Sequence, residues 1–164
     1  MQTTVNSIET KADDIKSKLD QIPPAWSQIL PAADRFQLVM GGAAVLDRET
    51  KLVWDQSPDT TTPNWVNALR HCYQREVGGR KGWRLPTIEE LASLIDPLAG
   101  VPALPSGHPF SNVQSFVYWS ATTFATDPSD AWYVNFDGGA VDDVDKTDTN
   151  FVWCVRGGQG VDPQ

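Results

Sequence analysis

The stretch from Asn135 to Gly158 holds the densest group of chemically active side chains in the chain. Four aspartates lie within seven positions, and they are Asp142, Asp143, Asp145 and Asp148. Carboxylates this close together could bind calcium or act as a catalytic pair. The run lacks the glycine and the distant glutamate of an EF-hand loop, and its Thr, Asn and Gly neighbours indicate solvent rather than a pocket that shifts pKa values. We therefore predict an exposed acidic loop without a metal, with a weak calcium site at Asp143, Asp145 and Asp148 as the alternative.

The two cysteines and two histidines offer little further chemistry. Cys72 and Cys154 are too few for a four-thiolate zinc site, and neither lies in a C-x-x-C motif. These residues alone leave open whether they are buried free thiols or one long-range disulfide. His71 and His108 are isolated, and a lone histidine is usually structural or exposed. The chain also lacks a P-loop, a dinucleotide fingerprint and a nucleophile elbow, so we predict no catalytic residues and no cofactor.

The composition restricts the partners. A net charge of −8 and a pI near 4.6 disfavour nucleic acid and anionic membranes, which need a basic face. No apolar run approaches the ~20 residues of a spanning helix, so membrane insertion is not expected. The opening residues, MQTTVNSIETKADD, lack the apolar segment of a signal peptide, and we predict no such signal in this chain. Seven tryptophans predict a domain with a large aromatic core.

Residues 1–24 are predicted to form an oligomerisation helix. Apolar residues recur alternately three and four apart from Val5 to Ile22, and isoleucine occupies the d positions of the resulting heptads. Isoleucine at d disfavours a parallel dimer, so we predict a trimeric coiled coil. An amphipathic helix packed on its own domain is the alternative. A proline pair ends the helix, and residues 25–42 are predicted to be a linking segment.

Residues 43–160 are predicted to form an α+β domain with antiparallel strands. Short apolar runs on both sides of Asp47–Lys51 predict a β-hairpin. A first helix is predicted to begin at Thr62 as its cap and to stop at Gly78. The helical spacing of its apolar residues turns Cys72 toward the core.

A second helix is predicted where Thr87 and Glu90 form a T-x-x-E capping box. Residues 100–112, rich in proline, glycine and serine, are predicted to be a long irregular loop. The remaining third is predicted to form strands, in the segments SFVYWSATT, DAWYVNF, GAVDDV and NFVWCVR. Alternation in the second segment places Tyr133 and Asn135 on the face opposite its apolar residues.

Four ordered motifs carry a family resemblance, and they are GWRLPTIEELASLID, YWSATT, AWYVNF and WCVRGG. From about Ala43 to Gly158 the chain resembles the C-terminal domain of bacterial collagen-like adhesins. The resemblance implies a C-type-lectin-like fold of the formylglycine-generating-enzyme branch, with two helices and antiparallel sheets. In that fold the cysteines of the first helix and the last strand face each other. The resemblance therefore implies a disulfide between Cys72 and Cys154.

The chain also resembles the variable proteins of diversity-generating retroelements, which occur in phages, archaeal viruses and prokaryotes. Such systems mutate adenine-derived codons near the 3′ end of a lectin-fold gene. Between Ser115 and Asn150, every residue except Trp119, Trp132 and Lys146 is of a kind reached by varying the first two bases of an asparagine codon. The ordinary preferences of strands and loops would give a similar composition. Because the motifs agree as well, we favour diversification.

This resemblance implies a fixed frame and a variable surface. The frame residues near the C-terminus would be Phe136, Val141, Phe151, Val152, Trp153, Cys154 and Arg156. The side chains between fixed positions would form the ligand-binding surface: Thr123, Phe124, Thr126, Asp127, Ser129, Asp130, Tyr133, Asn135, Asp137, Ala140, Asp142, Asp143, Asp145, Thr147, Asp148 and Asn150. Phe124 and Tyr133 would be aromatic anchors among small polar residues, a composition that adaptable binding surfaces use.

We therefore predict a non-enzymatic homotrimer, displayed on a virion or cell surface, that binds a protein or glycan ligand on another cell or virion. A carbohydrate-binding adhesin, with or without calcium, is one alternative. The acidic charge departs from the basic groove that sulfated polysaccharides need, and the E-P-N, Q-P-D and W-N-D motifs of calcium lectins are missing. An enzyme related to the formylglycine-generating group is the other alternative. Such an enzyme needs redox-active cysteines, whereas both cysteines here are assigned to the scaffold.

Overall fold

The computed structural model describes residues 30–157, and the predicted coiled coil in residues 1–24 lies outside that range. The helical segments are α2 (Ala32–Arg35), the 3₁₀ turn η1 (Met40–Gly42), α3 (Trp65–Gln74) and α4 (Ile88–Ala92). The strands are β1 (Phe36–Val39), β2 (Ala44–Asp47), β3 (Val53–Asp55), β4 (Val117–Thr123), β5 (Asp130–Asn135), β6 (Ala140–Asp145) and β7 (Val155–Arg156). None of the described helices is both long and apolar enough to cross a membrane.

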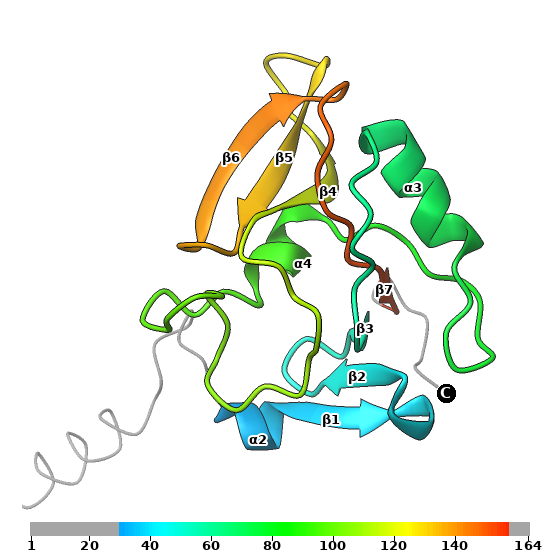
Figure 1. Cartoon of the computed structure of the whole chain (residues 1–164), viewed down its shortest axis with the longest axis vertical. Helices are drawn as coiled ribbons and strands as arrows, with labels where there is room; N and C mark the ends of the chain where they lie inside the picture. The colour runs from blue at the N-terminus through cyan, green and yellow to red at the C-terminus, as the bar shows by residue number, and fades with distance from the viewer. Residues whose placement is uncertain (1–29, 158–164) are drawn as a thin grey trace, which may run out of the picture.

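The strands form two antiparallel sheets, which confirms the predicted α+β class. One sheet has the order β1-β2-β3-β7 and the other the order β4-β5-β6. β1 and β2 lie at one end of the molecule and β4 to β6 at the other (Figure 1). The predicted hairpin is present as β2 and β3. The segment predicted as a link contributes β1, which pairs with β2 from Phe36 opposite Asp47 to Val39 opposite Ala44.

Helix α3 is shorter than the sequence predicted, and its cap is different. The side chain of Asn64, not of Thr62, accepts a hydrogen bond from the backbone N–H three residues on (3.2 Å). Asparagine is among the best N-cap residues, so the helix begins two residues later than predicted. It ends before Arg75, whose backbone is extended and whose guanidinium is bound by Asp55. Gly78 therefore lies in the following loop rather than at the helix end.

The predicted capping box of α4 is confirmed. The Thr87 hydroxyl accepts from the Glu90 backbone N–H (3.3 Å), and the Glu90 carboxylate accepts from the Thr87 N–H (2.9 Å). Arg84 holds the same carboxylate with two bonds of 2.7 Å. Leu91 and Leu94 are fully buried. Residues 100–112 form the expected irregular loop.

Trp153 lies at the centre of the larger core. Its ring is fully buried and makes edge-on contacts with Trp54 and Phe110, with ring centres 5.7 and 4.8 Å away. Its Nε1 donates to the backbone carbonyl of Asp55 (2.8 Å), so the polar atom of the indole is satisfied inside the core. The strand predicted around it is shorter than expected, because Phe151 and Val152 pair only through single bridges.

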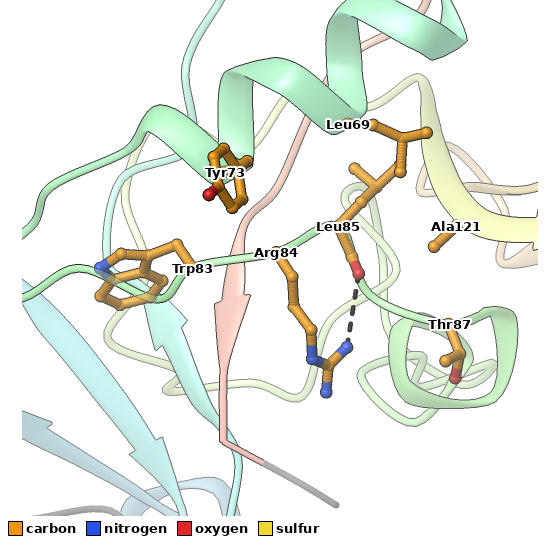
Figure 2. Close-up of a pocket in the computed structure, with 7 residues that line it drawn as sticks. All are labelled: Leu69, Tyr73, Trp83, Arg84, Leu85, Thr87 and Ala121. Atoms are coloured by element: carbon orange, nitrogen blue, oxygen red, sulfur yellow. Dashed lines mark hydrogen bonds between the residues drawn. The ribbon is translucent and has the colours of Figure 1, made fainter. Parts of the chain in front are cut away.

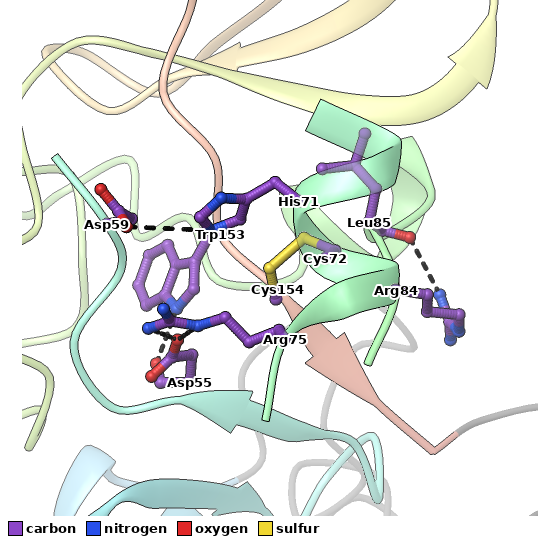
Figure 3. Close-up of a disulfide and its surroundings, with 9 residues drawn as sticks. All are labelled: Asp55, Asp59, His71, Cys72, Arg75, Arg84, Leu85, Trp153 and Cys154. Atoms are coloured by element: carbon purple, nitrogen blue, oxygen red, sulfur yellow. Dashed lines mark hydrogen bonds and ion pairs between the residues drawn. A yellow bond between two sulfur atoms is a disulfide. The ribbon is translucent and has the colours of Figure 1, made fainter. Parts of the chain in front are cut away.

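A disulfide joins α3 to the segment before β7. Cys72 and Cys154 are bonded, with their Cα atoms 5.4 Å apart, and both are buried (Figure 3). This confirms the pairing that the family resemblance implied. The bond fixes the segment before β7 onto α3 from inside the core.

Candidate ligand-binding surface

The predicted surface residues that belong to strands lie on both faces of the β4-β5-β6 sheet, and the others lie outside the strands. Residues directly opposite each other on antiparallel strands share a face, and neighbours along a strand alternate. The register of β5 and β6 therefore places these predicted residues on one face: Tyr133, Asn135, Ala140 and Asp142. It places these on the opposite face: Asp130, Asp143 and Asp145. Because β6 is the edge strand, the predicted surface wraps around that edge instead of covering one flat face.

Helix α4 covers part of the face that carries Asp130. Val134 lies on that face, and it is fully buried in the same cluster as Leu91 of α4 and Leu94, which follows the helix. The polar residues of this face thus lie toward the β4–β5 loop, where β5 begins at Asp130. This loop, residues 124–129, is half-buried at Phe124 and exposed beyond it. One end of the sheet therefore remains open for a ligand.

Two side chains differ from their predicted exposure. Asn150, expected on the surface, is only 7% exposed; its backbone N–H donates to the Pro63 carbonyl (3.3 Å), and its side-chain nitrogen finds no hydrogen-bond partner among residues 30–157. Val141, expected in the frame, is 43% exposed, because it lies on the edge strand. The other predicted surface residues are exposed or half-buried, and the other frame residues are buried or half-buried.

The two predicted aromatic anchors occupy different settings. The Phe124 ring packs edge-on against Trp132, with the ring centres 5.2 Å apart, and both are half-buried. Tyr133 lies between Trp119 of β4 and Asp142 of β6 in the register. Partial burial, followed by the charges of Asp142 and Asp143, raises the pKa of Tyr133. At neutral pH its hydroxyl therefore keeps its proton and can donate a hydrogen bond to a ligand.

Two aspartates of the surface use their oxygens to hold local turns. Asp127 accepts from the Ser129 N–H (3.0 Å) and hydroxyl (2.7 Å), and Asp145 accepts from the Thr147 N–H (2.8 Å) and hydroxyl (2.7 Å). These bonds favour the charged form and lower the pKa of both carboxyl groups. Both side chains therefore stay ionised at neutral pH.

Asp143 shows the effect of crowding. Desolvation, followed by the nearby carboxylates of Asp142 and Asp130, raises the pKa of Asp143. A cation from a ligand placed here would relieve this repulsion. Within residues 30–157, however, no three His, Cys, Asp or Glu side chains are arranged to hold a metal ion, so the structure does not assemble the alternative calcium site at Asp143, Asp145 and Asp148.

Comparison with models of protein families identifies the family to which this domain belongs. A model of the Lcl C-terminal domain matches residues 43–156, which is more than half of the chain. The chain belongs to the Lcl C-terminal domain family. The match confirms the resemblance carried by the four motifs and is consistent with a ligand-binding surface domain. A comparison with curated proteins found no significant match.

This Lcl C-terminal domain also has a hollow that the sequence did not predict. It has a volume of about 430 Å³ and lies between α3, the segment before α4 and β4 (Figure 2). Leu69, Leu85 and Ala121 supply apolar walls, and Tyr73 is 82% exposed at its side. Arg84 is committed to Glu90 and to backbone carbonyls. The lining comes from three separate segments, so no local pattern could have indicated it.

The disulfide region holds the remaining polar side chains of interest in the Lcl C-terminal domain. His71 Nε2 lies 3.9 Å from Asp59, and Arg75 binds the nearly buried Asp55 (Figure 3). Burial raises the pKa of Asp55 although Arg75 lowers it. The described part of the chain has no free cysteine. The two sulfur atoms are thus bonded to each other, Arg75 is paired with Asp55, and the buried His71 Nε2 neither accepts nor donates a hydrogen bond within residues 30–157.

Proposed function

We propose that this protein is a non-enzymatic ligand-binding protein displayed on a virion or cell surface. One observation carries the proposal: the C-terminal third divides into a buried frame and an open surface. Val152, Trp153 and Cys154 are buried, while the residues around the β6 edge are exposed or half-buried. A rigid support under adaptable polar side chains is the arrangement that recognition surfaces use.

Charge and aromatic content indicate how such a surface would bind. Tyr133 and the Phe124–Trp132 pair offer rigid contact area, and the neighbouring carboxylates offer acceptors. We propose a protein partner ahead of a glycan, because the surface is acidic and built from small adaptable side chains. The disulfide supports a location outside a reducing compartment, where such bonds persist. We also propose trimerisation through residues 5–22, which lie outside the described residues.

We further propose that a retroelement diversifies this surface. Two of the three residues that asparagine-codon variation does not reach have supporting roles. Trp119 is fully buried and its Nε1 donates to the Pro63 carbonyl (3.1 Å), and Trp132 packs against Phe124. Trp119 and Trp132, which support the sheet, are thus of a residue type that the proposed mutagenesis of asparagine codons does not produce. A reverse transcriptase gene and a near-identical copy of the 3′ end nearby would support this; their absence, with identical sequences across isolates, would refute it.

A protein and glycan array probed with the full chain tests the binding function. Tyr133→Ala should weaken the strongest array signal at least about tenfold, as loss of a central aromatic anchor does. Tyr73→Ala is the matched control, because Tyr73 is exposed outside the proposed surface. Equal losses in both variants, or none in either, would contradict the assignment. Repeating the array with calcium and then with a chelator separates a calcium-dependent lectin from the proposed protein.

A further inference from the structure

Lys146 lies directly after β6, at the end of the sheet where β4 finishes and β5 starts (Figure 1). Its Nζ donates to the Thr123 hydroxyl (2.9 Å) and the Pro128 carbonyl (2.7 Å), and lies 4.4 Å from the centre of the Trp65 ring. An ammonium has three N–H donors, and two oxygens with one aromatic face satisfy it. One side chain therefore joins the last residue of β4, the loop before β5 and the first residue of α3.

The backbone of Lys146 reinforces these contacts. Its N–H donates to the Ser129 carbonyl (2.9 Å), and its carbonyl accepts from the Trp65 N–H (3.2 Å). The bonds to Pro128 and Ser129 use main-chain oxygens of the loop, so they do not depend on which side chains the loop carries. The Thr123 bond is the exception, since it uses a hydroxyl on the proposed variable surface. Most of the anchoring thus comes from atoms that substitution of the loop would leave in place.

We infer that Lys146 is the positioning residue of the β4–β5 loop, an inference that rests on the proposed ligand-binding function. The loop carries Phe124, Thr126, Asp127 and Ser129 of the proposed surface. Its closure otherwise depends on a bond from the Phe124 N–H to the Asp130 carbonyl (3.0 Å) and on bonds within the turn. Lys146 fixes the backbone at the Pro128–Ser129 end and holds the Thr123 hydroxyl at the other, so the side chains from Phe124 to Asp127 can differ while the loop keeps one conformation.

Hydrogen exchange tests this inference without any ligand, so its outcome is independent of the proposed function. Lys146→Met keeps an unbranched side chain over Trp65 and removes the ammonium. We expect peptides covering residues 124–130 to exchange at least about tenfold faster, because the variant loses the charge-assisted bonds to Thr123 and Pro128 and the loss of one such bond alone accounts for about tenfold. Lys146→Arg should restore protection, because a guanidinium can donate to the same oxygens and stack on the ring.

Lys81→Met is the matched control, since Lys81 is exposed and its nearest carboxylate oxygen lies 3.7 Å away. It should leave exchange of the loop unchanged. Exchange that rises equally in β2 and β3 of the Lys146→Met protein would indicate general destabilisation and overturn the inference. Unchanged exchange of residues 124–130 would overturn it as well.

A second measurement tests whether the anchor is independent of the loop side chains. Phe124→Ser, Thr126→Ala and Asp127→Asn are introduced together, with Lys146 present or replaced by methionine. We expect loop protection to survive the three changes when Lys146 is present and to be lost when it is absent. Loss of protection with Lys146 present would mean that the side chains hold the loop, which would overturn the inference.

Discussion

Reduction of the disulfide should strongly destabilise the fold although it leaves the sequence of every helix and strand unaltered. Cys72 and Cys154 are separated by 82 residues, so the bond restricts a long loop of the unfolded chain. The chain-entropy relation for a loop of that length gives about 4.5 kcal/mol at room temperature. This is a large share of the 5–15 kcal/mol typical of folded domains, with a corresponding fall in melting temperature of about 15 °C.

Three samples separate the cross-link from the packing of the sulfur atoms. They are the oxidised protein, the same protein refolded in reductant, and the Cys72→Ala/Cys154→Ala variant. The reduced protein keeps both side chains, so its loss of unfolding free energy in urea measures the cross-link alone. The double variant also loses buried sulfur atoms and should be slightly less stable again. Refolding in reductant is needed because both sulfur atoms are buried.

A loss below about 2 kcal/mol in the reduced protein, under the usual range for native disulfides, would refute the reasoning. It would mean that the unfolded chain is already compact across this loop, or that the native bond opposes the fold. Alkylation of the native protein adds a chemical check. No thiol should react before reduction; a reactive thiol at either position would instead favour the enzyme related to the formylglycine-generating group.

Three further results are expected. Thr87→Ala removes half of the capping box and should lower the unfolding free energy in urea by about 1 kcal/mol. Thr62→Ala is the control and should leave it unchanged, so equal losses in the two variants would contradict the cap assignment. Burial raises the pKa of Tyr118 from 10.0 to about 12, so the folded state holds a proton that the unfolded chain releases. The unfolding free energy should thus fall as pH rises from about 10 to about 12, and it should fall less in Tyr118→Phe. An equal fall in that variant would mean that Tyr118 is not the titrating group. Charges on an edge strand oppose pairing with other chains. Replacing the β6 carboxylates of Asp142, Asp143 and Asp145 by asparagine should therefore increase self-association in light scattering. No increase would show that these charges do not protect the edge.

Local signals predicted much of this fold. The capping box at Thr87 and Glu90 and the hairpin around Asp47–Lys51 depend on residues close in sequence, and both are confirmed. The disulfide required the family resemblance, because two cysteines 82 residues apart leave no local trace of their pairing. Cys72 was correctly predicted to face inward from helical spacing alone.

The errors occur where tertiary contacts decide. β1 was missed because Phe36–Val39 becomes a strand only by pairing with β2. The sequence predicts Asn150 as an exposed polar loop residue. Its backbone N–H bonds to the Pro63 carbonyl, and its side chain is buried. Val141 reads as a core residue, yet no strand lies outside β6 within the described residues to cover it. Composition and alternation describe single strands, whereas burial depends on the neighbours that a strand acquires.

The division of the surface between two faces of β5 and β6 has a consequence for how binding can change by mutation. Tyr133 and Asp142 lie opposite each other on one face, so substitutions at these two positions should interact. Asn135 and Asp130 lie on different faces and at opposite ends of β5, so their effects on affinity should add. Improvements at Asn135 can therefore be combined with improvements at Asp130, whereas Asp143 interacts electrostatically with Asp142 and Tyr133 and couples the two faces near the middle of the strands.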